Sequence, residues 1–153
     1  MKQKFIFVFI LLTMLLMVNA IPYQLHKRAI DFGPCPDPPI PLLTVSLSSD
    51  TIEPGKTVTI TISGKLAEEV PAVPESTLVQ VAFTYADGTI IPNSFFSKDL
   101  CTRIKCPISA GTTFSIVENV PVPAELPLFK IMVGINDTEE FKFLGCASTG
   151  NLS

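Results

Sequence analysis

The chain has 153 residues, a length suited to one domain, and its 11 basic and 14 acidic residues give a formal charge of −3. This acidic balance disfavours nucleic acid as a partner, because phosphate neutralisation needs clustered Lys and Arg. It also disfavours attraction of the whole chain to an anionic membrane.

The N-terminus has the pattern of a secretory signal peptide over residues 1–20. Lys2 and Lys4 precede an apolar run from Phe5 to Val18, and Val18-Asn19-Ala20 offers small residues for cleavage. The run is shorter than a membrane-spanning helix needs, although a signal anchor is the alternative. We therefore expect entry into the secretory pathway, with the extracellular space or a vacuole lumen as the destination.

Residues 21–28 end in the dibasic pair Lys27-Arg28, which suggests a propeptide that is cleaved before Ala29. An exposed basic pair with no processing is the alternative. Cleavage would remove the single histidine, His26, and leave a domain at 29–153 with seven basic and 14 acidic residues.

Four cysteines remain in that domain, at positions 35, 101, 106 and 146. An even number in an oxidising compartment indicates disulfides, and three pairings are possible. The short loop from Cys101 to Cys106 is the least costly closure, which leaves Cys35 for Cys146. A zinc site is the alternative, but no histidine and no paired C-x-x-C motif follow residue 28, so we expect no metal.

Strand-like segments follow a proline-rich entry at 33–41. Leu43–Leu47 alternates apolar and polar residues, and Thr57–Gly64 does so strictly with mostly β-branched residues. Leu78–Tyr85 is the next predicted strand. The Asp87-Gly88 pair then predicts a hairpin turn.

The second half of the chain continues this pattern. An edge strand at Ile90–Phe96 is interrupted by Pro92, and the cysteine loop then turns the chain. Three further strands are predicted, at Thr113–Val117, Phe129–Ile135 and Glu140–Leu144, with a turn at Asn136-Asp137 before the last. About seven short strands without helical periodicity predict an all-β sandwich.

Catalytic chemistry finds little support in the residues of the mature chain. No histidine is present to activate a serine or threonine, and no Gly-rich phosphate loop occurs. The acidic residues, Glu118 among them, are interpreted as solvated turn residues. We therefore predict a non-enzymatic protein without a cofactor.

The predicted strands carry many apolar side chains. Among those expected to face inward, Tyr85 is the one ionisable residue. An ordinary filled core and a lined cavity are both compatible with this pattern. A cavity is of interest because a sixteen-carbon acyl chain in water costs about 13 kcal/mol, at ~0.8 kcal/mol per CH₂, so its carrier must enclose it.

Several short motifs together resemble the ML lipid-recognition domains, and within them the fungal phosphatidylglycerol/phosphatidylinositol transfer proteins, which are relatives of the Niemann-Pick sterol carriers. The similarity runs from Cys35 to Cys146. It rests on Pro54-Gly55-Lys56-Thr57-Val58-Thr59-Ile60, Gly64, Asp99-Leu100-Cys101, Cys106-Pro107-Ile108, Gly111, Val120-Pro121-Val122-Pro123 and Cys146. The chain departs from many relatives in having four cysteines rather than six, and Leu126-Pro127-Leu128-Phe129 stands where Pro-x-Gly-x-Tyr is common.

The resemblance implies an immunoglobulin-like two-sheet sandwich that admits a lipid between its sheets. It also implies the bridges Cys35–Cys146 and Cys101–Cys106. The expected function is intermembrane transfer of phosphatidylglycerol- or phosphatidylinositol-type phospholipids by a monomer that contacts membranes transiently. Sterol transport by the same fold is one alternative, and a secreted interaction module with a filled core is another.

The candidate site residues follow from the strand faces and the cysteine loop. Expected lipid-lining residues are Val58, Ile60, Ile62, Val79, Val81, Phe83, Phe95, Phe114, Ile116, Ile131, Val133, Ile135, Phe141 and Phe143. Expected headgroup or membrane contacts are Phe96, Lys98, Arg103 and Lys105, in or beside the loop that we place at the cavity mouth. Asn136-Asp137-Thr138 is an N-glycosylation sequon.

Overall fold

The computed structural model describes residues 30–36, 40–150 and 152, so the expected signal peptide and propeptide lie outside the described residues. These described residues form eight strands and one short 3₁₀ helix, η1. They are β1 (Phe32–Gly33), β2 (Thr44–Leu47), β3 (Thr57–Lys65), β4 (Thr77–Tyr85), β5 (Ile90–Asp99), η1 (Leu100–Thr102), β6 (Thr113–Pro121), β7 (Phe129–Asp137) and β8 (Lys142–Thr149). No helix among the described residues is long and apolar enough to cross a membrane.

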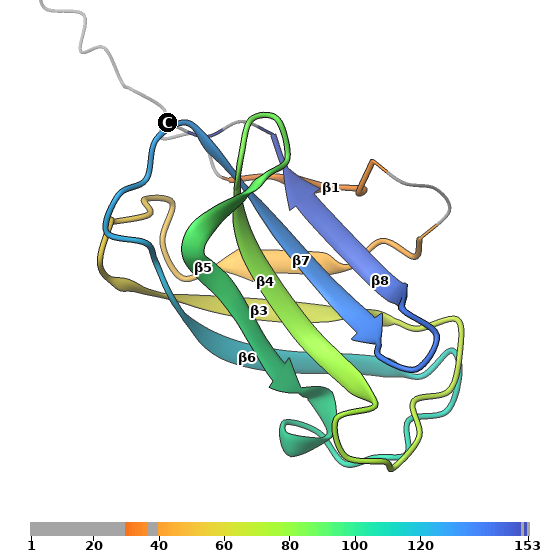
Figure 1. Cartoon of the computed structure of the whole chain (residues 1–153). Coiled ribbons are helices and arrows are strands. Elements are labelled where there is room, and N and C mark those ends of the chain that lie inside the picture. The colour runs from red at the N-terminus through yellow and green to blue at the C-terminus, as the bar shows by residue number, and fades with distance from the viewer. Residues whose placement is uncertain (1–29, 37–39, 151, 153) are drawn as a thin grey trace, which may run out of the picture.

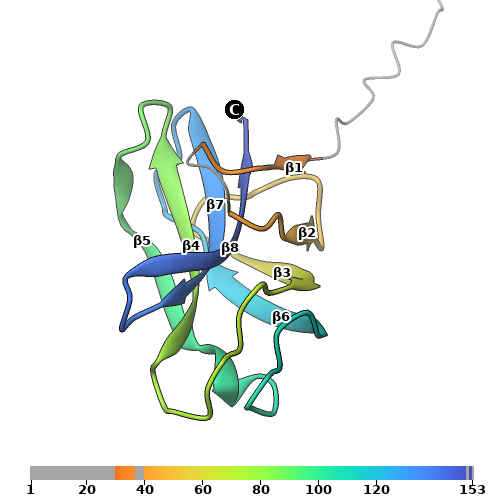
Figure 2. The same cartoon turned by 90° about the vertical axis from the view of Figure 1, so that its right-hand side faces the viewer.

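Two antiparallel sheets make up the molecule (Figure 1). One sheet has the order β1-β8-β7-β4-β5 and the other has the order β2-β3-β6. Figure 2 shows the sheets as two layers that face each other, and Figure 1 shows the strands of the smaller sheet crossing those of the larger one. The expected all-β, two-sheet sandwich is therefore confirmed.

The strand faces follow from the alternation of residue types. On β3, Val58, Ile60 and Ile62 are buried, and the intervening threonines face outward. Strand β6 alternates buried and exposed residues without a break from Thr113 to Pro121. The apolar members of both sets belong to the one hydrophobic cluster between the sheets.

Several predicted strand boundaries are wrong in the C-terminal half of the chain. Strands β5, β6 and β7 run past their expected ends, and β8 begins at Lys142 and continues through Cys146. The predicted turn at Asn136-Asp137 is instead the end of β7, and the turn lies at residues 138–141. The Asp137 carboxylate accepts hydrogen bonds from the backbone N–H groups of Glu139 and Glu140, so it supports the turn from the end of β7.

Both predicted disulfides are confirmed. Cys35–Cys146 joins the N-terminal segment to β8 across 111 positions, and Cys101–Cys106 closes the loop that contains η1. The first bridge is supported by residues 41–43, where Cys146 N–H donates to Pro41 O and Leu43 N–H donates to Cys146 O. The N-terminal segment that contains Cys35 is thus fixed to β8.

Candidate functional site

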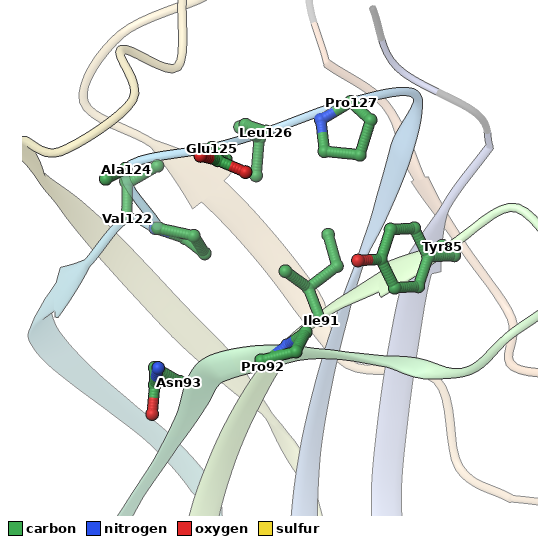
Figure 3. A pocket seen from close by; sticks show the side chains of 10 residues that line it. Tyr85, Ile91, Pro92, Asn93, Val122, Ala124, Glu125, Leu126 and Pro127 are labelled. Carbon is green, nitrogen blue, oxygen red and sulfur yellow. The ribbon is translucent and has the colours of Figure 1, made fainter.

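A groove of about 760 Å³ lies between the edges of the two sheets. One side is formed by the end of β4 and the start of β5, and the other by the connection that leaves β6 for β7 (Figure 3). Its lining consists of Tyr85, Ile91, Pro92, Asn93, Val122, Pro123, Ala124, Glu125, Leu126 and Pro127. The groove therefore opens where neither edge strand, β5 or β6, has a further neighbour.

The floor of the groove is continuous with the apolar interior. Ile91 and Val122 line the groove, yet each is at most 6% exposed and belongs to the hydrophobic cluster. In Figure 3, Val122, Leu126 and Pro127 lie along one side, with Ile91 and Tyr85 across from them. An apolar molecule could pass from this groove into the space between the sheets.

Two turns position the walls of the groove. On one wall, Gly88 has φ of 92°, and Gly88 N–H donates to Tyr85 O to close the β4–β5 hairpin. The Asp87 carboxylate accepts hydrogen bonds from the backbone N–H and hydroxyl of Thr89, which lower the pKa of Asp87. On the other wall, Gly55 N–H donates to Pro123 O and holds the proline-rich connection against the smaller sheet.

Eleven of the fourteen predicted lining residues are buried, as expected from their alternation. They are Val58, Ile60, Ile62, Val79, Val81, Phe83, Phe114, Ile116, Ile131, Val133 and Ile135, and none is more than 5% exposed. They belong to both sheets and pack against each other in one cluster. These side chains form the apolar interior, so a ligand between the sheets would contact them.

The orientation of the adjacent residues Phe95 and Phe96 is the reverse of the predicted one. Phe95 pairs with Ala82, on the outer face of the larger sheet, and is 52% exposed. Phe96 pairs with Val81 and packs against the core. Period-two alternation requires that the two rings face opposite ways but does not determine which faces inward.

The inward orientation predicted for Phe141 and Phe143 is also wrong. Phe141, with φ of 52°, ends the β7–β8 turn and is 88% exposed. Ile135 pairs with Gly145 but Asn136 pairs with Phe143, so Leu144 is an extra residue in β8. This bulge reverses the alternation, and the Phe143 ring lies against Gly134, where a Cβ atom would approach it to 2.6 Å.

Two of the predicted headgroup residues, Arg103 and Lys105, lie far from the groove. Strand β5 carries groove residues at its start, and η1 follows its end, about 30 Å away at ~3.3 Å per residue. The cysteine loop does not border this groove, and its place beside a cavity mouth stays a prediction. Lys98 Nζ lies 5.7 Å from the centroid of the Phe96 ring, and Lys105 is exposed.

Arg103 contacts Glu118, a residue whose burial differs from the prediction. Its Nη2 donates a hydrogen bond of 2.9 Å to Glu118 Oε2, and its Nε lies 2.5 Å from Oε1. Glu118 is not a solvated turn residue but lies in β6 with its side chain only 1% exposed. Phe114 and Ile116 are two positions apart and both face inward. Extending this alternation past Val117 places Glu118 on the same inner face.

The described residues contain no group of three or more His, Cys, Asp or Glu side chains that could hold a metal ion. The sequon residue Asn136 is half-buried in β7, and the Thr138 hydroxyl donates to the carbonyl oxygens of Glu75 and Ser76. Use of this sequon for glycosylation stays a prediction.

Comparisons with known proteins give a consistent result. A family model for the ML domain matches residues 29–149. A Niemann-Pick type C2 protein from Japanese carpenter ant is 14% identical with a TM-score of 0.58, over 80% of this chain and 99% of that one. Chicken MD-1, solved in complex with lipid IVa, is 15% identical with a TM-score of 0.51, over 80% of this chain and 88% of that one.

A search of curated proteins found no match. The two solved structures share the fold, and the family model spans most of the chain. The chain therefore belongs to the ML domain family.

Proposed function

We propose that this protein binds a lipid between its two sheets and carries it between membranes. The observation that supports this most directly is the groove at the β5 and β6 edges, whose residues Ile91 and Val122 are also part of the core. Chicken MD-1, which has a similar fold, was solved with a lipid, lipid IVa. The two groove residues that belong to the hydrophobic cluster are compatible with a cavity that opens between the sheets on loading.

The ligand would enter through the groove with its apolar part first. Enclosing a sixteen-carbon chain offsets about 13 kcal/mol of exposure to water. That free energy is comparable with the total stability of a typical domain, about 5–15 kcal/mol, so it can compensate for moving the sheets apart. Loading would separate the β5 edge from the connection after β6, where the groove already keeps them apart.

Transport of phosphatidylglycerol- or phosphatidylinositol-type phospholipids is the leading hypothesis, and it rests on the sequence resemblance. Lys98 and Lys105 would then contact an anionic membrane surface, whereas the charge of Arg103 is already matched by Glu118. Secretion, glycosylation at Asn136 and a monomeric state belong to the same proposal. Both disulfides favour an oxidising compartment.

Sterol transport is favoured by one specific observation. The groove lining contains no Lys or Arg, and its hydrogen-bonding side chains are Tyr85, Asn93 and Glu125. A tyrosine hydroxyl, an amide and a carboxylate suit a ligand hydroxyl better than a phosphate. Competition between a sterol and phosphatidylinositol for the delipidated protein would separate the two ligands.

The test compares two Ala→Trp variants in a vesicle assay. Ala124 is exposed and lines the groove, so Ala124→Trp fills it without overpacking the core. Ala110 is exposed in the turn before β6, and Ala110→Trp adds the same side chain away from the groove. We expect Ala124→Trp to slow transfer of fluorescent phospholipid or sterol at least ~10-fold, which is ~1.4 kcal/mol, and Ala110→Trp to leave it unchanged.

Mass spectrometry of the native protein completes the test, because a co-purifying lipid identifies the ligand directly. Failure of the wild-type protein to bind or transfer either lipid class would refute the proposal. It would favour the alternative of a secreted interaction module with a filled core.

A further inference from the structure

Glu118 interrupts the apolar interior of the sandwich. It shares the inner face of β6 with Phe114, Ile116 and Val120, and it pairs with Ile60 of β3. Among residues 30–36, 40–150 and 152 it is the only charged side chain that is buried. The Glu118 carboxylate occupies a position where a valine or isoleucine would make an apolar contact.

Arg103 reaches Glu118 from the opposite sheet. It follows η1, which continues directly from β5, whereas Glu118 belongs to β6 of the smaller sheet. The guanidinium contacts both carboxylate oxygens, through Nη2–Oε2 at 2.9 Å and Nε–Oε1 at 2.5 Å. The pair therefore connects the two sheets across their open side, at the end of β5 that is away from the groove.

The backbone that carries Arg103 is held in place from several directions. Arg103 N–H donates to Leu100 O, and the Asp99 carboxylate accepts from Cys101 N–H. The Cys101–Cys106 bridge closes the loop, and Leu100 is fully buried beneath it. These contacts fix the backbone from which the Arg103 side chain reaches Glu118.

The ion pair lies on the inner face of β6, which leads to the groove. Val122 lines the groove, Val120 is the next inner residue of β6, and Glu118 comes after it. Val122 comes four positions after Glu118, which is about 13 Å at the rise of a strand. A methylene group placed beyond Glu118 would have to displace the charged pair or remove its remaining water. An apolar group makes no hydrogen bond that could offset this cost.

We propose that the Glu118–Arg103 pair forms the inner end of the lipid compartment, so that Glu118 determines the length of apolar chain that the protein accepts. This inference rests on the proposed lipid-binding function. It makes Glu118 a specificity-determining residue and Arg103 its positioning residue. The sheets would open at the groove and stay joined at η1.

The experiment measures binding of lysophosphatidylcholines whose single chain is lengthened stepwise, with one headgroup throughout. Each enclosed CH₂ should tighten binding about fourfold until the chain reaches the ion pair, after which the Kd should level off. In Glu118→Val the inner face of β6 becomes wholly apolar, and the Kd should continue to fall over at least two more carbons. Glu118→Gln keeps a polar group there and should level off at the wild-type length.

Glu139→Val serves as the control for loss of one negative charge, because Glu139 is exposed in the β7–β8 turn. It should behave as the wild type does. Levelling of Glu118→Val and wild type at the same chain length would overturn the inference while leaving lipid binding intact. Absence of binding at every chain length in the wild type would instead overturn the proposed function, and this inference with it.

Hydrogen exchange on the wild-type protein provides a second test that needs no variant. On loading with the longest chain that binds, amides of the connection 122–128 should change their exchange rate. The amides of Arg103 and Ile104, which donate to Leu100 O, should keep theirs. Loss of protection at these two amides on loading would show that the η1 end opens, and would overturn the inference.

Discussion

Removing either member of the Arg103–Glu118 pair should have very different effects on stability. Arg103→Gln leaves a carboxylate that is 1% exposed without a counter-ion, whereas Glu118→Val leaves a guanidinium that is 35% exposed and can turn toward water. Breaking a buried pair costs about 3–5 kcal/mol, and the partial exposure of Arg103 places this pair near ~3 kcal/mol. Replacement of the carboxylate by an apolar side chain should be about neutral, within ~1 kcal/mol.

Urea unfolding followed by far-UV circular dichroism measures the difference. At an m-value of about 1.5 kcal/mol/M, a loss of ~3 kcal/mol lowers the midpoint by about 2 M. Lys142→Gln is the control, because Lys142 pairs with Glu68 and Glu140 on the surface and its loss should leave the midpoint unchanged. Equal losses from Arg103→Gln and Glu118→Val would refute the reasoning, since they would mean that the attraction of the pair, and not burial of the carboxylate, sets the cost.

Two further predictions concern the disulfides and the hairpin beside the groove. Replacing Cys35 and Cys146 by Ala should cost about 5 kcal/mol, because the bridge spans 111 positions, whereas replacing Cys101 and Cys106, five positions apart, should cost about 2 kcal/mol. Urea unfolding of both double variants checks this, and equal costs would contradict it. The pKa of Asp87 is lowered by the Thr89 N–H, so its stabilising effect is present above pH ~3.8 and lost as the pH falls through the folded-state pKa. Asp87→Asn should therefore be less stable than the wild type at neutral pH and approach it in acid; a pH-independent difference would count against this.

Much of the fold was predictable because strict alternation fixes both the type and the face of a strand. Val58, Ile60 and Ile62 illustrate this, as do Val79, Val81 and Phe83. Alternation failed where the register changed. The extra residue Leu144 in β8 sends Phe143 to the outer face, and no local feature of the sequence announces that bulge.

The candidate site was less predictable because it depends on which segments meet. The groove joins the start of β5 to the connection after β6, about 30 positions apart in sequence, and only the arrangement of the sheets brings them together. The basic residues of the cysteine loop were expected at the mouth because they are close in sequence to Phe95 and Phe96. Glu118 was misplaced because the predicted strand ended at Val117, one residue too early to include it.

The prolines of the two edge strands have a consequence for the behaviour of the protein at high concentration. Pro92 in β5 and Pro121 at the end of β6 carry no N–H, and Asn93 has φ of 59°, which bends the β5 edge beside the groove. An open sheet edge ordinarily recruits strands from other molecules. The two prolines each remove one N–H donor from an edge, and Asn93 makes the β5 edge less flat. The sandwich can thus keep one side open to solvent without templating cross-β aggregation.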